Sequence, residues 1–577
     1  MTIDPILASV MQRAFKSITD EMSISMMRTT RSPILCEAKD FVTGLYDADG
    51  NMLEQTENLP ILSFSLGPVC KHLLATFAGD IHPGDVFFHN DVFSYGNQNN
   101  DVAAFKPIFL DENTLIGWAA TKGHMADIGG AVKGGYNPNA TEVFQEALRI
   151  PAVKIVDRGK LRKDVWDLIF ANIRLDIVQD DMRAEIGACT VGERRLKALV
   201  EKIGRERFEA HKEYLFASTE KMMRAEIRRI PNGVYRGEGK VFFDGKHPGS
   251  EFTIRVTITV EDEEIRFDYA GTDAQTDGFV NGTYTSSASA TTLTFLQMVN
   301  PDLPHNQGML RPLRIDIPEG TILNARYPKA TTFGNHLCPP NADAIQRALA
   351  PAIPDRVCAG WNHLLCSLTT GRDPEKQDDY VDICFMGLKG GSGAMEGTDG
   401  YDHIGMIDAS GGLLDQDYEM FEQQTPHRLI RHEYLLDSAG AGRWRGGLGV
   451  ETEIVLHGER TQLVTFGDGD VKPAFGLFGG KQGTLNSIDL DRPDGATYRT
   501  TSKDFVTHLP DGTRYRQQAG GGGGWGNPHQ RPAAVVAREV RDGLISREAA
   551  ERDYGVVLGD GTFEVDEIAT RRLRGMP

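Results

Sequence analysis

The sequence predicts an α+β fold that mixes helices with antiparallel strands. Residues 4–32 and 161–229 carry apolar side chains at the spacing of amphipathic helices. Residues 252–260 alternate apolar and polar side chains, which is typical of an antiparallel strand with one solvated face. From about residue 380 the chain is rich in glycine and turn residues and holds several short strand candidates. Together these stretches indicate a mixed architecture.

A helix followed by a hairpin opens the predicted fold. Over residues 4–32 the helical spacing is carried by Ile6, Val10, Phe15, Ile18, Met22 and Met26. A strand-like segment then leads to residues 47–50, a turn sequence between two apolar runs. From 85 to 154, short apolar runs alternate with polar, glycine-containing stretches, which we interpret as strands joined by site-bearing loops. Residues 1–160 are therefore predicted to be an N-terminal, site-bearing region.

Three further regions follow in this prediction: a helical segment at 161–230, an α+β middle region at 231–380, and a glycine-rich, β-containing C-terminal region at 381–577. One helical face is marked by Leu168, Ile169, Ile173 and Ile177, and another by Leu196, Leu199, Val200 and Ile203.

Within the middle and C-terminal regions, more local elements are expected. Strands are predicted over 252–260 and 265–269, and helices near 286–298 and 546–554. The run Gly520–Gly524 is interpreted as a flexible linker, because the strand and helix that flank a phosphate-binding glycine loop are missing around it.

Composition excludes several classes of function. The 577 residues have a formal net charge of −19 and no run rich in Lys and Arg, which argues against a nucleic-acid-binding protein. The first residues do not resemble a signal peptide, and no window is apolar enough to cross a membrane, so we expect a cytoplasmic protein. Its seven cysteines are scattered and form no Cys-x-x-Cys pair, which favours reduced, mostly buried thiols.

Two neighbouring stretches concentrate polar groups that could carry chemistry. Residues 89–101 are crowded with amides and carboxylates, and His124 and Asp127 follow about twenty residues later. Such oxygen and nitrogen donors, flanked by apolar strands, suit a divalent ion. A structural alternative is that Asp91 and Asp101 cap turns and that the neighbouring amides of Asn97, Asn99 and Asn100 bind loop backbone groups.

The order of motifs resembles the hydantoinase B/oxoprolinase family along almost the whole chain. The N-terminal matches are Asn90-Asp91, Gly96 to Asp101, His124 to Gly130 and Gln145 to Pro151. Further matches are Trp166 to Arg174, Tyr327 to Ala330, Asp437 to Gly449, Gly476 to Gly480 and Gly520 to Pro528.

This resemblance implies an enzyme subunit of B type that works with a larger A-type subunit, which binds ATP and phosphorylates the substrate. The chain contains no Gly-x-x-x-x-Gly-Lys-Ser/Thr loop, which agrees with a nucleotide site on the partner. The resemblance also implies a divalent metal (Zn, Mn or Mg) at Asp40, Asp101, His124 and Asp127. His124 is the expected proton carrier, because imidazole titrates near neutral pH.

One departure concerns the stretch from Gly96 to Asp101, where many relatives carry a histidine and this chain reads Gly-Asn-Gln-Asn-Asn-Asp. An amide oxygen is a weaker zinc ligand than imidazole but suits harder ions such as manganese or magnesium.

Three functions stay open at this point. The first is ATP-dependent hydrolysis of a cyclic amide, meaning a hydantoin, oxoproline or lactam. The second is ATP-dependent carboxylation of a ketone such as acetone or acetophenone. The third is a non-catalytic scaffold for the ATP-binding partner. Each implies a hetero-oligomer that binds neither nucleic acid nor membrane.

Overall fold

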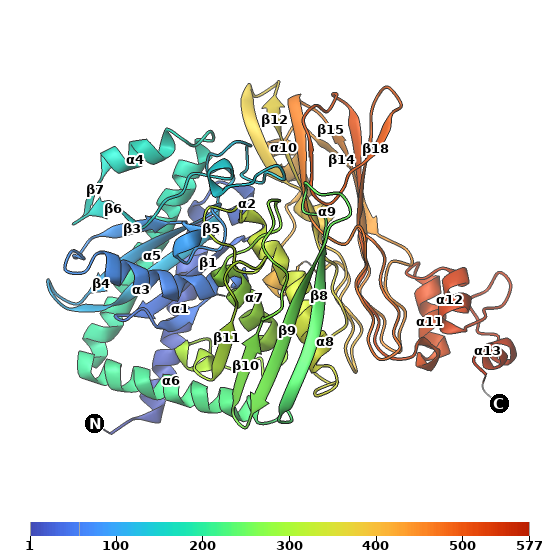
Figure 1. Cartoon of the computed structure of the whole chain (residues 1–577), viewed down its shortest axis with the longest axis horizontal. Coiled ribbons are helices and arrows are strands. Elements are labelled where there is room, and N and C mark those ends of the chain that lie inside the picture. The colour runs from blue at the N-terminus through green and yellow to red at the C-terminus, as the bar shows by residue number, and fades with distance from the viewer. Residues whose placement is uncertain (1, 57, 405, 576–577) are drawn as a thin grey trace.

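The computed structural model describes residues 2–56, 58–404 and 406–575, and it confirms the predicted α+β class (Figure 1). The described strands form sheets of seven, four, four and five strands, in which antiparallel pairing predominates. Helices pack against these sheets or between them, as expected for a mixed architecture.

The N-terminal sheet has seven strands in the order β2-β1-β5-β4-β3-β6-β7, all paired antiparallel. Its strands are β1 (Phe41–Asp47), β2 (Met52–Gln55), β3 (Val86–His89), β4 (Asp101–Phe109), β5 (Leu115–His124), β6 (Val153–Asp157) and β7 (Lys160–Leu161). The pairing of β1 with β2 confirms the predicted hairpin.

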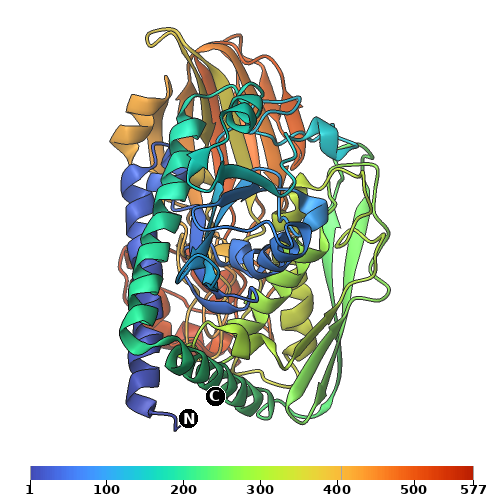
Figure 2. The same ribbon diagram turned by 90° about the vertical axis from the view of Figure 1, so that its left-hand side faces the viewer.

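Two long helices lie side by side along this sheet (Figure 2). They are α1 (Pro5–Thr29) and α5 (Ile177–Ile203). The side chain of Asp4 accepts a hydrogen bond from the Ile6 N–H and caps α1. Four predicted apolar positions of α1 are buried, but Ile6 is 76% exposed and Val10 53% exposed, so the predicted stripe is wrong at its start. Ala8 and Met11 are the buried positions of these first turns instead.

Other helices complete the N-terminal half. They are α2 (Pro33–Cys36), α3 (Leu66–Thr76), α4 (Lys163–Phe170) and α6 (Arg205–Ile227). The predicted helices between 161 and 229 are thus confirmed as α4, α5 and α6. Within α4, however, Leu168 is 67% exposed, so it does not belong to the buried face.

The middle of the chain forms a four-stranded sheet in the order β11-β10-β9-β8. The strands are β8 (Gly233–Phe242), β9 (Glu251–Glu261), β10 (Glu264–Asp268) and β11 (Leu313–Asp316). They carry α7 (Tyr284–Leu296) and α8 (Cys338–Leu349). Helix α8 lies directly on β8, since a Cβ added to Gly239 would stand 1.7 Å from the Pro340 carbonyl oxygen. Only glycine permits this approach.

Two sheets build most of the C-terminal region, in the orders β13-β12-β16-β19 and β14-β15-β20-β17-β18. The first contains β12 (Leu365–Asp373), β13 (Asp378–Ile383), β16 (Glu459–Gly467) and β19 (Asp504–Val506). The second contains β14 (Arg428–Tyr434), β15 (Val450–Leu456), β17 (Ser487–Asp491), β18 (Thr497–Arg499) and β20 (Thr513–Ala519).

Short helices accompany these sheets, and three more form the C-terminal end of the molecule, seen at one side of Figure 1. The helices are α9 (Phe385–Leu388), α10 (Tyr418–Gln424), α11 (Ala533–Arg541), α12 (Arg547–Tyr554) and α13 (Glu567–Leu573). The predicted helix near 546–554 is confirmed as α12.

The run Gly520–Gly524 is not a flexible linker, and that prediction is wrong. All five glycines are buried. The carbonyl of Gly522 accepts from the Gly440 N–H at 2.8 Å, and the Gly522 N–H donates to the Gly447 carbonyl at 2.9 Å. The Gly523 N–H donates to the Gly360 carbonyl, and the Gly523 carbonyl accepts from the Ala394 N–H, both at 2.9 Å. Successive residues of the run therefore form backbone hydrogen bonds with different segments of the chain.

One hydrophobic cluster extends from Ala8 to Phe466 and so draws on all four predicted regions. Two smaller clusters lie within the C-terminal sheets and beneath the C-terminal helices. The region boundaries near 160, 230 and 380 stay predictions. In the described part of the chain, no helix combines the length and apolar character needed to cross a membrane.

Candidate functional site

Two of the predicted site residues meet because their strands are neighbours in the N-terminal sheet. Strand β4 begins at Asp101 and β5 ends at His124, and these two residues are directly paired in the register. The Nδ1 atom of His124 lies 2.9 Å from Oδ1 of Asp101, and both side chains are buried. The sheet thus builds a buried carboxylate–imidazole pair at the start of β4 and the end of β5, two interior strands.

Asp40, the residue before β1, lies next to this pair. Its carbonyl oxygen accepts a hydrogen bond from the His124 N–H at 3.1 Å, while its side-chain Oδ1 is buried without a partner. Burial raises the pKa of Asp40 to about 7; the charge of His124 opposes this rise and that of Asp101 adds to it. Burial alone would lower the pKa of His124, but the Asp101 hydrogen bond and both carboxylates raise it.

Residues from distant parts of the chain complete the walls of this site. Tyr136 stacks between the rings of His124 and Phe466, with centroid distances of 5.8 and 3.8 Å. Its hydroxyl donates to Gln98 Oε1 at 3.3 Å. The Nδ2 of Asn335 donates to Asp101 Oδ2 at 3.2 Å. Both oxygens of Asp101 are therefore engaged, one by imidazole and one by an amide.

Several buried polar atoms around the pair have no hydrogen-bond partner. They are Asp40 Oδ1, Gln98 Nε2, Asn335 Oδ1, His336 Nδ1 and Asp408 Oδ1. Burying such atoms unpaired costs on the order of 1–3 kcal/mol each. Burial lowers the pKa of His336 to about 3, helped by His124 and Lys503, so this imidazole is neutral. The cluster is thus prepared for a polar ligand or an ion.

A buried lysine lies on the same strand as His124. The Nζ of Lys122 donates to Asn97 Oδ1 at 2.8 Å and also contacts Ser65 Oγ. Burial lowers the pKa of Lys122 to about 8, although Asp101 and Glu185 act in the opposite direction. Its charge partly balances the carboxylates of the site.

The structural alternative for the polar stretch is correct for some residues. Asp91 caps a turn by accepting from the Phe93 N–H at 3.3 Å. Asn100 Nδ2 donates to the Gly134 carbonyl at 2.7 Å, so it binds loop backbone. Asn99 differs, because neither polar atom of its buried side chain has a partner. Asp101 belongs to the site, as described above.

Asp127 has a different environment from the other predicted ligands. Its Oδ1 lies 2.8 Å from Nη1 of Arg174, and its Oδ2 accepts from the Arg174 N–H at 2.9 Å. The N–H of Gly134 also donates to Oδ1, at 3.2 Å. The buried carboxylate of Asp127 is therefore paired with a guanidinium and with loop backbone.

A group of three His, Cys, Asp or Glu donors within 4.8 Å of one another does occur among the described residues, but at His403, Asp415 and His432. Asp40, Asp101, His124 and Asp127 are not members of it. Gln98 could have been noticed in the polar stretch. Tyr136, Asn335, His336 and Asp408 could not, because no motif in the sequence links them to His124.

The hydantoinase B/oxoprolinase family model matches residues 4–528. The chain belongs to the hydantoinase B/oxoprolinase family. It is 34% identical to the caprolactamase beta subunit of Pseudomonas jessenii, over 99% of both chains. It is 30% identical to the B subunit of a provisionally named D-/L-hydantoinase of Pseudomonas sp. (strain NS671), over 99% of this chain and 98% of that one.

Solved structures of two ATP-dependent enzymes share the fold of this family member. The crystal structure of the ATP-dependent caprolactamase from Pseudomonas jessenii superposes with a TM-score of 0.92 at 31% identity, over all of both chains. The nucleotide-free structure of acetone carboxylase has the same TM-score at 21% identity, over 99% of this chain and 82% of that one. At that identity the second match shows the fold alone.

Proposed function

We propose that this chain is the B-type subunit of an ATP-dependent complex that hydrolyses a cyclic amide, meaning a lactam, hydantoin or oxoproline. The observation that carries the proposal is the end-to-end match to a caprolactamase beta subunit, at 34% identity over 99% of each chain. The A-type partner binds ATP and phosphorylates the carbonyl oxygen, since an amide is a poor electrophile until that oxygen becomes a leaving group. The complex is cytoplasmic in this proposal.

Asp40, Asp101 and His124 are the residues that would hold a divalent ion. Two carboxylates and an imidazole suit Zn²⁺, Mn²⁺ or Mg²⁺, and the unpartnered Asp40 Oδ1 is free to bind such an ion. A bound ion would act as a Lewis acid toward a carbonyl oxygen. Asp127 is left out of this set, because its carboxylate is already paired with the Arg174 guanidinium at 2.8 Å, whereas Asp101 contacts an amide and the His124 ring.

His124 is the proposed catalytic residue. Its Nδ1 is held by Asp101 at 2.9 Å, which fixes the ring and leaves Nε2 as the reactive nitrogen. Stacking on Tyr136 restricts the ring further. The buried carboxylates favour the protonated ring, and when no ion occupies Nε2, protonated His124 can give its proton to the leaving amide nitrogen. A ring that binds the ion through Nε2 cannot do so, and the ion alone would then act on the carbonyl.

The decisive experiment reconstitutes the chain with its co-expressed A-type partner. The complex is incubated with ATP, caprolactam, hydantoins, 5-oxoproline, acetone and acetophenone, with and without labelled bicarbonate. ATP-dependent ring opening of a cyclic amide supports the proposal. Label incorporated into a ketone would establish the carboxylase alternative instead. Formation of a complex that turns over none of these substrates would favour the scaffold.

A further inference from the structure

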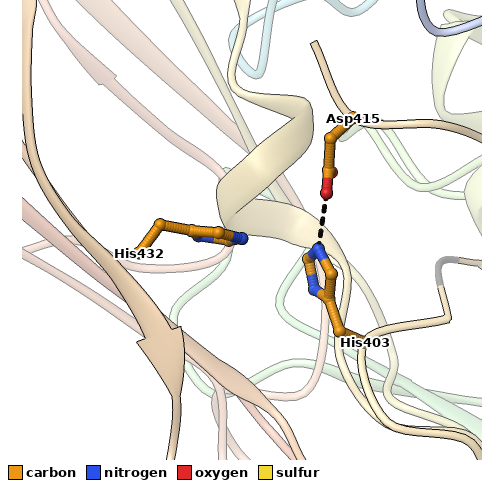
Figure 3. A group of neighbouring side chains, drawn as sticks. All are labelled: His403, Asp415 and His432. Atoms are coloured by element: carbon orange, nitrogen blue, oxygen red, sulfur yellow. Dashed lines mark hydrogen bonds and ion pairs between the residues drawn. The ribbon is translucent and has the colours of Figure 1, made fainter. Parts of the chain in front are cut away.

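A second cluster of metal-binding side chains lies in the C-terminal region (Figure 3). His403 precedes a long loop, Asp415 stands near the end of that loop, and His432 lies in the middle of β14. One nitrogen of each imidazole and one oxygen of the carboxylate are within 4.8 Å of one another. All three side chains are partly buried, so they are ordered by their surroundings and still accessible.

The hydrogen bonds of His403 point to a cation at this position. Its Nδ1 is 3.0 Å from the carbonyl oxygen of Lys389, and a carbonyl can only accept, so Nδ1 carries the proton. In a neutral ring Nε2 then has a free lone pair, yet it stands 2.7 Å from Oδ2 of Asp415. Two acceptors this close require a positive charge: either a proton on Nε2, or a metal ion that binds both atoms once the contact widens to about 3.3 Å, the ligand separation of a tetrahedral zinc site.

His432 and Lys389 fit the same interpretation. Nδ1 of His432 lies 2.8 Å from Oγ1 of Thr452 and can donate to it, which leaves the lone pair on Nε2. Figure 3 shows this ring pointing toward His403. Lys389 Nζ contacts Oδ1 of Asp415 at 2.7 Å and leaves Oδ2 for an ion. Ligating histidines commonly bind a backbone or side-chain oxygen through their second nitrogen.

We propose that His403, Asp415 and His432 form a binding site for a Zn²⁺ ion. Two imidazoles and one carboxylate are a donor set that zinc accepts, with water or another ligand completing a tetrahedron. This site is separate from Asp40, Asp101 and His124, and it does not depend on the proposed reaction.

The ion would fix a segment that packs against the candidate functional site. Within residues 406–417, the N–H of Leu414 donates to the Ala38 carbonyl at 3.3 Å, and that of Asp417 donates to Glu37 at 3.1 Å. The same segment carries Asp408, whose pKa is raised to about 7 by burial and by the charge of Asp40. Zinc bound at His432 therefore ties this segment to β14 and positions it beside Asp40.

Zinc binding to the full chain, stripped with a chelator, tests this site. Calorimetry and elemental analysis are applied to the wild type, His432→Asn, His403→Ala and His124→Ala. His432→Asn and His403→Ala are each expected to abolish the binding of one zinc equivalent, or to lower its affinity at least ~100-fold. His124→Ala is expected to leave that equivalent in place. Substituting Co²⁺ gives a second readout, because the absorption band of the tetrahedral site should vanish in His432→Asn and persist in His124→Ala.

His457→Ala is the matched control. His457 also contacts an aspartate, Asp511, at 3.1 Å, but it belongs to no three-donor group among the residues that the structure describes. It should bind zinc as the wild type does. Circular dichroism confirms that each variant is folded. The proposal is overturned if neither His403→Ala nor His432→Asn reduces zinc binding relative to the wild type. The contact between His403 and Asp415 would then be a hydrogen bond from a protonated imidazole.

Discussion

At the scale of single residues, the candidate site is defined by buried groups that lack partners. Asp40 Oδ1, Gln98 Nε2 and His336 Nδ1 are unpaired around the His124–Asp101 pair. Natural proteins rarely leave polar atoms in this state without a functional reason. Ordered water or a bound ligand can satisfy these atoms, and the proposed function requires such a polar ligand.

His124→Ala tests the centre of this group. The substitution removes the imidazole whose charge offsets those of Asp40 and Asp101, and with it the proposed proton carrier, so we expect kcat to fall by at least ~10². The free energy of unfolding should fall by ~3 kcal/mol, because the buried carboxyl groups lose the imidazole that compensates them. ATP-dependent turnover by the reconstituted complex and urea denaturation of the chain measure the two effects. Full activity of this variant would show that His124 is not the catalytic residue.

Asp382 allows a test of pH-dependent stability away from the site. Burial raises the pKa of its carboxyl from 3.8 to about 7, opposed by a hydrogen bond from Gln416 and reinforced by Glu37. The folded state therefore holds a proton that the unfolded state releases, and this contribution to stability is lost as pH rises from about 4 to 7.

Asp382→Asn removes the charge at nearly constant shape. At pH 8 it should be more stable than the wild type by on the order of 2 kcal/mol, and at pH 4 the difference should disappear. Urea denaturation at both pH values gives the comparison. A variant equally destabilised at both would show that packing, and not ionisation, governs this position.

At the scale of elements, strand pairing and close glycine contacts decide the geometry. The register of β4 and β5 places Asp101 opposite His124, and Asp40 directly precedes β1, the other neighbour of β5. In the C-terminal region, Gly522 and Gly523 lie so close to neighbouring backbone that an added Cβ would stand 1.9 or 1.8 Å from a carbonyl oxygen. Segments without regular secondary structure are thereby packed into one bundle.

Gly523→Ala should therefore be strongly destabilising. Its Cβ would collide with the carbonyl of Phe475, which is backbone and cannot move alone. We expect a loss of more than ~3 kcal/mol, or an insoluble chain. Gly187→Ala is the control, because this glycine lies inside α5 with nothing within 4 Å of the added Cβ. It should be neutral or stabilising by up to ~1 kcal/mol. The midpoints of thermal unfolding of the two variants and the wild type give the comparison.

At the scale of the whole molecule, the division of labour between two subunits is the central expectation. The sequence contains no phosphate-binding loop of the Gly-x-x-x-x-Gly-Lys-Ser/Thr type, and the run Gly520–Gly524 is fully engaged in backbone packing. The glycines that most resemble a nucleotide cradle are thus unavailable for that role. ATP should be bound by the A-type partner.

Calorimetry with the isolated chain tests this expectation. We predict no binding of ATP at concentrations up to ~1 mM, whereas the reconstituted complex binds it in the same buffer. The complex serves as the positive control for protein quality and nucleotide. Micromolar affinity of the chain alone would place a nucleotide site on this polypeptide and contradict the proposed division.

The sequence by itself determined the family, the α+β class and the main local elements. Helices α1 and α5, the β1–β2 hairpin and strand β9 follow from periodicity, because side-chain spacing is a local property of the backbone. Motif order identified Asp40, Asp101 and His124 as candidates through resemblance. Ile6 and Leu168 are exposed although helical periodicity predicts that they are buried, since burial depends on what a helix packs against.

Only the tertiary structure decided which polar groups share a site. Asp127 pairs with Arg174, while Tyr136, Asn335 and Asp408 come from other segments to surround His124 and Asp40. The buried glycine bundle at 520–524 and the His403–Asp415–His432 cluster also form only when distant segments meet. Spacing along a chain constrains neighbours within a helix or hairpin. Contacts across hundreds of residues depend on packing that no local pattern encodes.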